Sequence, residues 1–388
     1  MKNISFSSKQ LFGILGGITL TAGCGWATND NPENKPNIIF IYADDLDADE
    51  INYTADSVHT WPTSFGMQKL NIGTPVHGKN PNVLTPNIDG LAENGAVFTR
   101  FYVNATVSTP SRYCLLSGRY ATRGSELQDR YPEGAHATLN WDPGILRKES
   151  NLPKELKKYG YRTGLVGKWH NLPNKFKNTE VKGKMYHKHD PTMEEVQEIE
   201  ENLEYNYHAA QEYLKEGFGW DVVARNEWGN SILNLDWMCE GALQFIEESQ
   251  DNPFFLYLAL PVPHGQYKFD YNDLSRQNRR LCPAGILPEA PMVLPSDENI
   301  YKRLEENGIP KENAMATYMD DYVGAVLNKL KELGLRENTL VIFTSDHGNR
   351  GKNSCYEGAA RMPLFASWPA QIKAGTRCNS LCGNIDIA

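Results

Sequence analysis

The amino-acid sequence predicts an α/β fold in which a mostly parallel central sheet is sandwiched between helices. Short apolar runs without polar alternation recur along the chain, as expected for strands that are buried on both faces. Stretches with helical periodicity separate these runs, which is typical of repeated strand–helix–strand units. Charged residues directly follow several of the runs, at the sheet edge where open α/β folds bind ligands.

The first half of the chain supplies three of the expected strands. The first is expected at residues 37–43, where the sequence reads NIIFIYA. A helix over 86–93, which begins with proline, leads into a second strand at 96–103. A short helix over 153–158, which also begins with proline, leads into the strand at 163–166.

The second half continues the alternation after a long interruption. Residues 171–230, rich in Lys, Glu, His and Tyr, are interpreted as an excursion from the core on the substrate side. Helices are expected over 231–248 and over 313–333, where apolar residues recur on one helical face. The remaining strands are expected at the apolar runs 254–260, 339–344 and 364–366.

The first 28 residues are interpreted as a secretory signal peptide. Lys2 and Lys9 precede an apolar run over 11–22 that is too short to span a bilayer, and small residues follow it. Cys24 resembles a bacterial lipoprotein processing site, which predicts membrane attachment through a lipidated cysteine; plain secretion is the alternative. The chain is therefore expected to be exported by a bacterium, to the periplasm or to the outer membrane or cell surface as a lipoprotein.

Residues 29–35 are interpreted as a polar linker, and 36–388 as one folded domain. The chain has 48 acidic and 39 basic residues and a net charge of −9, which argues against a protein that coats nucleic acid. No C-x-x-C pair suggests zinc or redox chemistry, but Cys378 and Cys382 are close enough in sequence to form a local disulfide. The other cysteines of the domain are expected to be buried or scattered thiols.

Polar residues follow the expected strands at the points where the strands end. These residues are Asp44 and Asp45, Lys168 and His170, His264, and Asp346 and His347. A lone Asp or His in such a place is most often a solvated loop residue. Because the carboxyl ends of parallel strands meet at one edge of a sheet, this repeated placement predicts an active site there.

The residue types at this edge indicate the chemistry. Asp44, Asp45 and Asp346 provide carboxylate oxygens, which suit a hard divalent cation such as Ca²⁺. Positive charge comes from Lys168, Lys352, Arg112 and the histidines, and it favours an anionic, tetrahedral substrate group. The candidates for proton transfer near neutral pH are His264 and His170.

The candidate nucleophile is Ser108, in the segment Ser108-Thr109-Pro110-Ser111-Arg112. Pro110 suits the first turn of a helix and Thr109 suits its N-cap, so Ser108 is expected just before a helix N-terminus. Free N–H groups and the helix dipole favour anions at that end.

This segment, followed by Ser117-Gly118-Arg119, resembles the signature of the formylglycine-dependent sulfatases in the alkaline-phosphatase superfamily. That signature is C/S-x-P-S/A-R, followed after four residues by T/S-G-R. The likeness covers nearly all of residues 36–388. Further segments resemble the family's metal-binding and sulfate-binding motifs: 35–45, 167–170, 344–348 and 352–363. The segment 263–264 resembles the motif of its leaving-group histidine.

The resemblance implies a sulfuric ester hydrolase that acts on a sulfated carbohydrate. In this family the signature residue is oxidised to formylglycine (3-oxoalanine), and Ser108 resembles the serine type, which is matured by a radical-based enzyme that needs no oxygen. A hydroxyl of the hydrated aldehyde attacks sulfur, a histidine protonates the departing oxygen, and the second hydroxyl then expels sulfate.

The resemblance also implies a role for each site residue. Arg112 would orient the formylglycine, and His264 would be the general acid. The sulfate-binding residues would be Lys168, His170 and Lys352. One divalent cation, Ca²⁺, would be held by Asp44, Asp45, Ser108, Asp346 and His347.

The sequence departs from the family pattern at two places. His347 stands where the family often has Asn or Gln, and nitrogen is a poor Ca²⁺ ligand, so His347 either binds the metal or hydrogen-bonds beside it. The family continues past the segment 384–388 into a helix and a small C-terminal sheet subdomain, so that subdomain is expected to be missing. The chain alone is then expected to expose an apolar patch around 364–366 and to be poorly soluble or poorly active.

Two rival functions fit part of the pattern. A metal-dependent phosphodiesterase or phosphonate hydrolase of the same superfamily would use an unmodified Ser108, and His347 would suit a zinc pair. The second zinc of such an enzyme needs a D-x-x-x-H motif, which the sequence lacks. A non-catalytic glycan-binding lipoprotein would explain the export signal and the aromatic residues, but it would not need the charged residues at the strand ends.

Overall fold

The computed structural model describes residues 35–47, 50–53, 83–131, 134, 142–183, 191–228, 232–264 and 273–388. The predicted signal peptide with Cys24, and the predicted linker apart from Lys35, lie outside these residues. Within the described part of the chain, no helix combines the length and the apolar character needed to cross a membrane.

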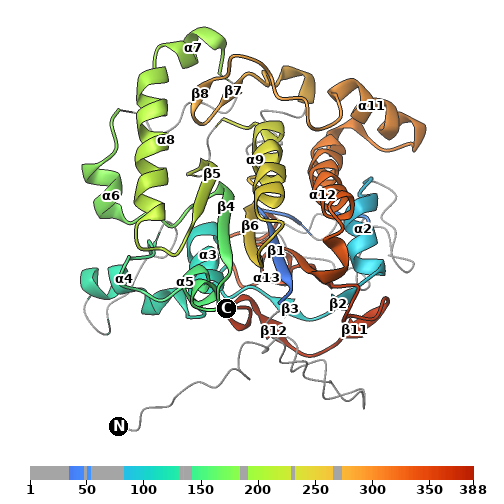
Figure 1. Cartoon of the computed structure of the whole chain (residues 1–388), viewed down its shortest axis with the longest axis horizontal. Coiled ribbons are helices and arrows are strands. Elements are labelled where there is room, and N and C mark those ends of the chain that lie inside the picture. Colours follow the sequence, from blue (N-terminus) through green and yellow to red (C-terminus); the bar gives the residue numbers. More distant parts are fainter. Residues whose placement is uncertain are drawn as a thin grey trace.

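A large sheet forms the centre of the described chain (Figure 1), with the strand order β11-β2-β10-β9-β1-β6-β4-β5. Its strands are β1 (Asn37–Ala43), β2 (Ala96–Phe98), β4 (Arg162–Lys168), β5 (Val222–Glu227), β6 (Phe254–Ala259), β9 (Thr339–Ser345), β10 (Leu364–Ser367) and β11 (Thr376–Cys378). Strand β10 runs antiparallel to β9 and β2, and the other adjacent pairs are parallel. The prediction of a mostly parallel sheet is therefore confirmed.

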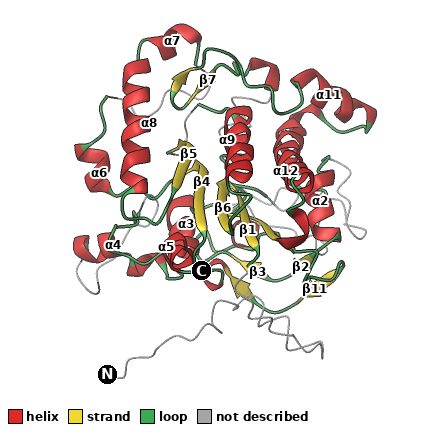
Figure 2. Ribbon diagram, in the orientation of Figure 1, coloured by secondary structure: helices red, strands yellow, loops and turns green. Residues whose placement is uncertain are grey.

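Helices lie on both sides of the sheet (Figure 2). One face packs against α2 (Pro86–Glu93), α9 (Leu235–Glu248) and α12 (Ala314–Glu332). The other face packs against α3 (Ser108–Ser117), α5 (Leu152–Lys158) and α8 (Glu200–Lys215). The remaining helices of the described chain are α4 (Ser125–Arg130), α6 (Asn174–Thr179), α7 (Met193–Gln197), α11 (Asp297–Glu306) and α13 (Glu357–Ala360).

Short elements complete the described chain. The strand pairs outside the main sheet are β3 (Phe101–Tyr102) with β12 (Cys382–Gly383), and β7 (Leu281–Cys282) with β8 (Gly285–Ile286). The 3₁₀ turns are η3 (Ala121–Arg123), η4 (Leu274–Arg276), η5 (Lys311–Asn313), η6 (Arg336–Asn338) and η7 (Asn384–Asp386).

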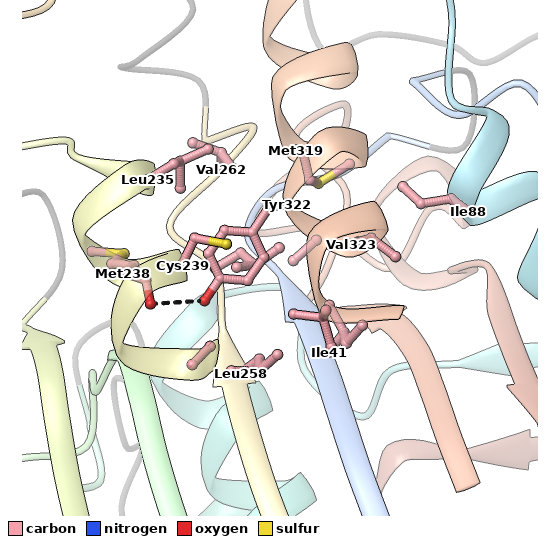
Figure 3. Packing of buried hydrophobic residues seen from close by; sticks show 14 of the residues in the cluster. Ile41, Ile88, Leu235, Met238, Cys239, Leu258, Val262, Met319, Tyr322 and Val323 are labelled. Atoms are coloured by element: carbon pink, nitrogen blue, oxygen red, sulfur yellow. Dashed lines mark hydrogen bonds between the residues drawn. The ribbon is translucent and has the colours of Figure 1, made fainter. Parts of the chain in front are cut away.

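The central strand β1 divides the core into two layers. Ile39 and Ile41 contact the layer of α9 and α12, whereas Phe40 and Tyr42 contact the layer of α3 and α5. Between α12 and α9, the Tyr322 hydroxyl donates a hydrogen bond of 3.2 Å to a backbone carbonyl (Figure 3). Because both faces of β1 are buried, its apolar run was recognisable in the sequence, and the predicted boundaries are confirmed.

Three expectations from the sequence are wrong in part. The strand expected at 96–103 is split, because Phe101–Tyr102 leave the main sheet and pair with β12. The helix expected from residue 231 begins at Leu235, after Asn234, whose side chain accepts a hydrogen bond from the Trp237 N–H. The segment 171–230 is not wholly an excursion, because its strand β5 extends the main sheet beside β4.

Two further expectations concern the C-terminal third. Leu364, Phe365 and Ala366 are each less than 5% exposed, so the exposed apolar patch expected there is wrong. They are covered because β10 lies between β9 and β2 inside the sheet. Cys378 and Cys382 are both free thiols in the structure.

Candidate active site

The predicted site residues gather at the carboxyl-terminal edge of the central sheet. Strand β1 ends directly before Asp44, and strand β9 ends directly before Asp346. Their backbones are joined there, because the Asp346 N–H donates to the Ala43 carbonyl at 3.1 Å. Helix α3 brings Ser108 to the same edge, and its hydroxyl lies 3.1 Å from a carboxylate oxygen of Asp44.

Asp44 faces the nucleophile candidate and two cations. Its Oδ1 accepts hydrogen bonds from the Ser108 hydroxyl and, at 3.3 Å, from the Arg112 guanidinium. Its Oδ2 is hydrogen-bonded to the Lys168 ammonium. Burial alone would raise the pKa of Asp44, but the charges of Lys168, His264 and Arg112 hold this pKa well below its usual range.

Asp45, the next residue, has its backbone in the left-handed region, with φ of 59°. Its carboxylate lies 2.9 Å from the Lys352 ammonium, 3.0 Å from His347 Nε2 and 3.4 Å from His264 Nε2. Burial alone would raise the pKa of Asp45, but the hydrogen bond and charge of His347 hold it well below its usual range. A non-glycine residue with this backbone is uncommon and is concentrated at functional sites.

The Asp346 carboxylate connects the strand ends after β1 and β9 with Arg112 of helix α3. Its Oδ1 accepts from the Asp45 N–H at 3.1 Å and from the His347 N–H at 2.8 Å, and its Oδ2 accepts from Arg112 Nε at 3.1 Å. Burial and the nearby charge of Asp44 raise the pKa of Asp346. A cation at this edge would relieve that repulsion between carboxylates.

The orientation of His347 suits a metal ligand. Its Nδ1 lies 3.0 Å from the Gly348 carbonyl, which can only accept, so Nδ1 carries the proton of that hydrogen bond. The other ring nitrogen, Nε2, lies 3.2 Å from the Ser108 hydroxyl and 3.0 Å from an Asp45 carboxylate oxygen. A ligating histidine usually donates its other N–H to a carbonyl or a carboxylate in this way.

Three of the predicted metal-binding residues form a group that could hold an ion. Asp45, Asp346 and His347 are buried, and each offers a ligand atom within 4.8 Å of the others. This donor set of two carboxylates and one imidazole fits a divalent cation. Asp44 and Ser108 lie beside the group, since the Ser108 hydroxyl contacts both Asp44 and His347.

Helix α3 begins differently from the expectation. Ser108 is the first residue of the helix, Val107 is the extended N-cap residue, and no side chain caps this end. The expectation that Thr109 is the N-cap is therefore wrong. The Ser108 hydroxyl instead turns toward Asp44 and His347.

The trailing Ser-Gly-Arg of the signature closes helix α3. Gly118 takes the left-handed conformation with φ of 62°, and its N–H donates to the Cys114 carbonyl. Ser117 bonds the Tyr113 carbonyl at 2.7 Å, and Arg119 lies 3.6 Å from the buried Glu149. This part of the motif is structural in the geometry observed.

Lys168 is aimed by the residue before it. Gly167 has φ of 94°, and a Cβ atom there would lie 2.1 Å from the Ala259 carbonyl oxygen. The pairing of β4 with β5 shifts register at the same point, because Arg225 is an additional residue of a β-bulge. His170 follows two residues later, where burial and the charge of Lys168 lower its pKa well below the usual value.

The members of the site differ in exposure. Ser108, Asp44, Arg112, Lys168 and Asp346 are at most 2% exposed. The Lys352 side chain is 26% exposed and that of His264 is 11% exposed. Burial lowers the pKa of His264 to about 4, although the charge of Asp44 raises it. His264 and Lys352 are therefore more open to solvent than these five residues.

Sequence reasoning missed the residues that support Arg112 from behind. The guanidinium lies 5.0 Å from the centre of the Tyr42 ring, and Tyr257 is buried beside it. The Tyr42 hydroxyl is 3.1 Å from the Ser111 hydroxyl. Both tyrosines belong to strands whose apolar runs gave no indication of a polar role.

Comparison with known proteins identifies the family to which this chain belongs. The family model for sulfatases matches residues 36–388. The chain belongs to the sulfatase family. It is similar to the N-acetylgalactosamine-6-O-sulfatase of Bacteroides thetaiotaomicron, with 26% identity over 463 residues that cover 100% of this chain and 78% of the relative. It is also 27% identical to the human N-acetylgalactosamine-6-sulfatase, over 80% of this chain.

Several solved structures share the fold of this chain. The crystal structure of Ps i-CgsB in complex with k-i-k-neocarrahexaose has a TM-score of 0.54 and 25% identity, covering 91% of this chain and 70% of that one. The phosphonate monoester hydrolase of Agrobacterium radiobacter has a TM-score of 0.53 and 17% identity, covering 91% and 72%, which is a likeness of fold alone. This sulfatase-family chain spans 57% of the length of the human relative.

Proposed function

We propose that this sulfatase-family chain hydrolyses sulfate esters of glycans, with a nucleophile formed from Ser108 and residues 36–388 as its catalytic domain. One observation carries the proposal. The Ser108 hydroxyl is 3.1 Å from Asp44 and 3.2 Å from His347, at a helix N-terminus beside the cations Arg112 and Lys168. An anionic group that approaches Ser108 meets this positive charge in a buried, low-dielectric site.

The residues around Ser108 have separate tasks in this proposal. Arg112, held by Asp44 and Asp346, fixes the orientation of the nucleophile. Lys168, His170 and Lys352 bind the sulfate oxygens. His264 stands at the exposed side of the site and is the proposed proton donor to the departing sugar oxygen, with its pKa of about 4 in the free site raised by the negative charge of bound sulfate.

Two groups complete the chemistry. Asp45, Asp346 and His347, with Asp44 and Ser108 beside them, would hold one divalent cation, proposed as Ca²⁺, which supplies positive charge against the sulfuryl oxygens when bound. A formylglycine at Ser108 supplies a hydrated aldehyde whose second hydroxyl can expel sulfate, whereas a plain serine would be left as a stable sulfate ester. A radical-based, serine-type maturase is the proposed partner that forms it.

The substrate class follows from the relatives and the export signal. Several relatives are named as sulfatases of N-acetylgalactosamine, and another, from Bacteroides thetaiotaomicron, is named an endo-4-O-sulfatase. The apolar run and Cys24 near the N-terminus support export, with attachment to the membrane through a lipidated cysteine. A sulfated glycan outside the cytoplasm is the substrate that fits both.

The proposed function is tested with the full chain produced together with a serine-type maturase without oxygen. We expect sulfate release from 4-nitrophenyl sulfate and from at least one sulfated sugar in a panel that begins with 6-sulfated N-acetylgalactosamine. The same preparation is given bis(4-nitrophenyl) phosphate and a phosphonate monoester. Faster cleavage of either phosphorus ester than of any sulfate ester, or glycan binding without any turnover, would refute the proposal.

Replacing His264 by alanine is expected to affect poor leaving groups selectively. A sugar oxygen needs a proton as it departs, so turnover of the sulfated sugar should fall by about 10²–10⁴-fold. Nitrophenolate departs without a proton, so turnover of 4-nitrophenyl sulfate should fall by less than about tenfold. Initial rates with both substrates measure the difference.

The control for this experiment is His208→Ala. His208 is an exposed histidine on helix α8, which packs against the edge strand β5. It should leave both rates unchanged. Equal losses with the sugar and the nitrophenyl substrate in His264→Ala would mean that His264 binds sulfate instead of donating the proton.

A further inference from the structure

The segment around η7 packs against helix α3, the helix that carries Ser108. Strand β12 pairs in parallel with β3, which runs into the loop before helix α3. Directly after β12, Asn384 is completely buried against α3. A buried amide must have its hydrogen-bonding groups satisfied, so its partners show what the segment does.

Each end of the Asn384 amide is bonded to the chain that carries Ser108. Its Oδ1 accepts a hydrogen bond of 2.9 Å from the backbone N–H of Asn104, in the loop before α3. Its Nδ2 donates to the Ser111 carbonyl at 3.0 Å and to the Ser111 hydroxyl at 2.9 Å, in the first turn of α3. A flipped amide would oppose like groups at both ends, so the orientation is determined.

The Ser111 hydroxyl passes this connection to the metal-binding edge. Its Oγ donates to the backbone carbonyl of Asp346 at 2.6 Å. With its one proton used, the hydroxyl accepts from Asn384 and, at 3.1 Å, from the Tyr42 hydroxyl. One donor and two acceptor positions are then filled, which is the full capacity of a serine hydroxyl.

We infer that Asn384 is a positioning residue for the nucleophile. Its amide bridges the chain on both sides of Ser108, from Asn104 to Ser111, and through Ser111 it sets the distance between α3 and Asp346. In the described part of the chain, the hydrogen bonds of the Asn384 side chain go to Asn104 and Ser111 and not to Ser108 itself. This inference rests on the proposed function, because it assumes that Ser108 supplies the reacting group.

The position of such a group matters more for rate than for binding. A displacement on the order of 1 Å can cost about 10²-fold in turnover, because the reacting atoms must be aligned. The sulfate-binding residues Lys168 and Lys352 are carried by other elements, β4 and the loop after β9, so they should be little affected.

The test compares Asn384→Asp with Asn234→Asp. The first variant keeps the size of the side chain and its acceptor for Asn104, but it loses the donors to Ser111. Asn234 is a close match: it is also 0% exposed, accepts from one N–H at 3.0 Å and donates to two carbonyls at 2.7 and 3.0 Å. Its partners are Trp237, Arg279 and Leu281, outside the site.

We expect both variants to melt at lower temperature, but only Asn384→Asp to lower kcat, by at least about tenfold, with KM within about twofold. Equal kcat values for the two folded variants would overturn the inference. If Asn384→Asp does not fold, Asn384→Ser, which is smaller and keeps a donor, is measured with the same expected direction.

Amide hydrogen exchange separates this inference from the proposed function. In Asn384→Asp, exchange should accelerate at residues 104–111, and in Asn234→Asp it should accelerate at 235–238 instead. If wild type releases no sulfate, the proposed function fails, but the exchange data still test whether Asn384 holds residues 104–111 in place. Unchanged exchange at 104–111 in the Asn384 variant would overturn the inference whatever the activity.

Discussion

Replacing Ser108 by alanine is expected to lower turnover of an aryl sulfate by at least about 10⁴-fold, the scale of losing a covalent nucleophile. Ser108 is 2% exposed and its hydroxyl contacts Asp44 and His347, and an alanine removes the one group at this position that could react. In wild type matured by the radical enzyme, the peptide that contains Ser108 should be two hydrogens lighter and should react with a hydrazide. Initial rates and peptide mass spectrometry measure the two effects.

The matched control is Thr109→Val at the neighbouring position. Thr109 is 1% exposed, and within the described part of the chain its hydroxyl has no hydrogen-bond partner, so an isosteric valine should leave activity unchanged. Full sulfatase activity in wild type that carries an unmodified Ser108 would contradict the formylglycine proposal. Activity retained in Ser108→Ala would contradict the role of this residue altogether.

Replacing Asp45 by asparagine is expected to remove the proposed divalent cation and to lower turnover by at least about 10²-fold, since that ion would stabilise charge in the transition state. Asp45 belongs to the group of three residues whose ligand atoms lie within 4.8 Å of each other. The substitution by asparagine removes the negative charge of this ligand. Elemental analysis should fall from about one ion per chain to none. A chelator should lower the melting temperature of wild type but not that of the variant.

Asp236→Asn controls for the loss of any buried carboxylate. Asp236 is 0% exposed and lies in the first turn of α9, 2.7 Å from Arg279 and 2.8 Å from the Tyr318 hydroxyl of α12. This variant should lose stability but keep its metal ion. Metal content and activity that survive in Asp45→Asn would mean that the carboxylates at the strand ends are ordinary loop residues.

The sequence by itself determined where the main strands end and which charged residues follow them. The run at 37–43 is apolar without interruption because both faces of β1 are covered, so its boundary before Asp44 was visible locally. The same reasoning located Asp346 after β9. Since carboxyl ends of parallel strands share an edge, these local boundaries were enough to predict that distant residues meet.

Other features depended on contacts that no local pattern encodes. Strand β5 has a mixed sequence, VVARNE, and it belongs to the sheet only because β4 offers its free edge. The Ser108 hydroxyl turns inward, so α3 begins without a side-chain cap and Thr109 does not serve as one. The segment at 364–366 is covered because β2 lies on its outer side, contrary to the expected exposed patch.

The support of Ser108 is the clearest case of what only the tertiary structure decided. Asn384 bonds Ser111 across 273 residues of sequence, and Asp45 meets Asp346 across 301. Hydrophobic periodicity reports the burial of a residue within its own element, but it carries no information about which donor meets which acceptor. Hydrogen bonds are directional and short, so their partners exist only after the sheet, α3 and the 382–386 segment have packed together.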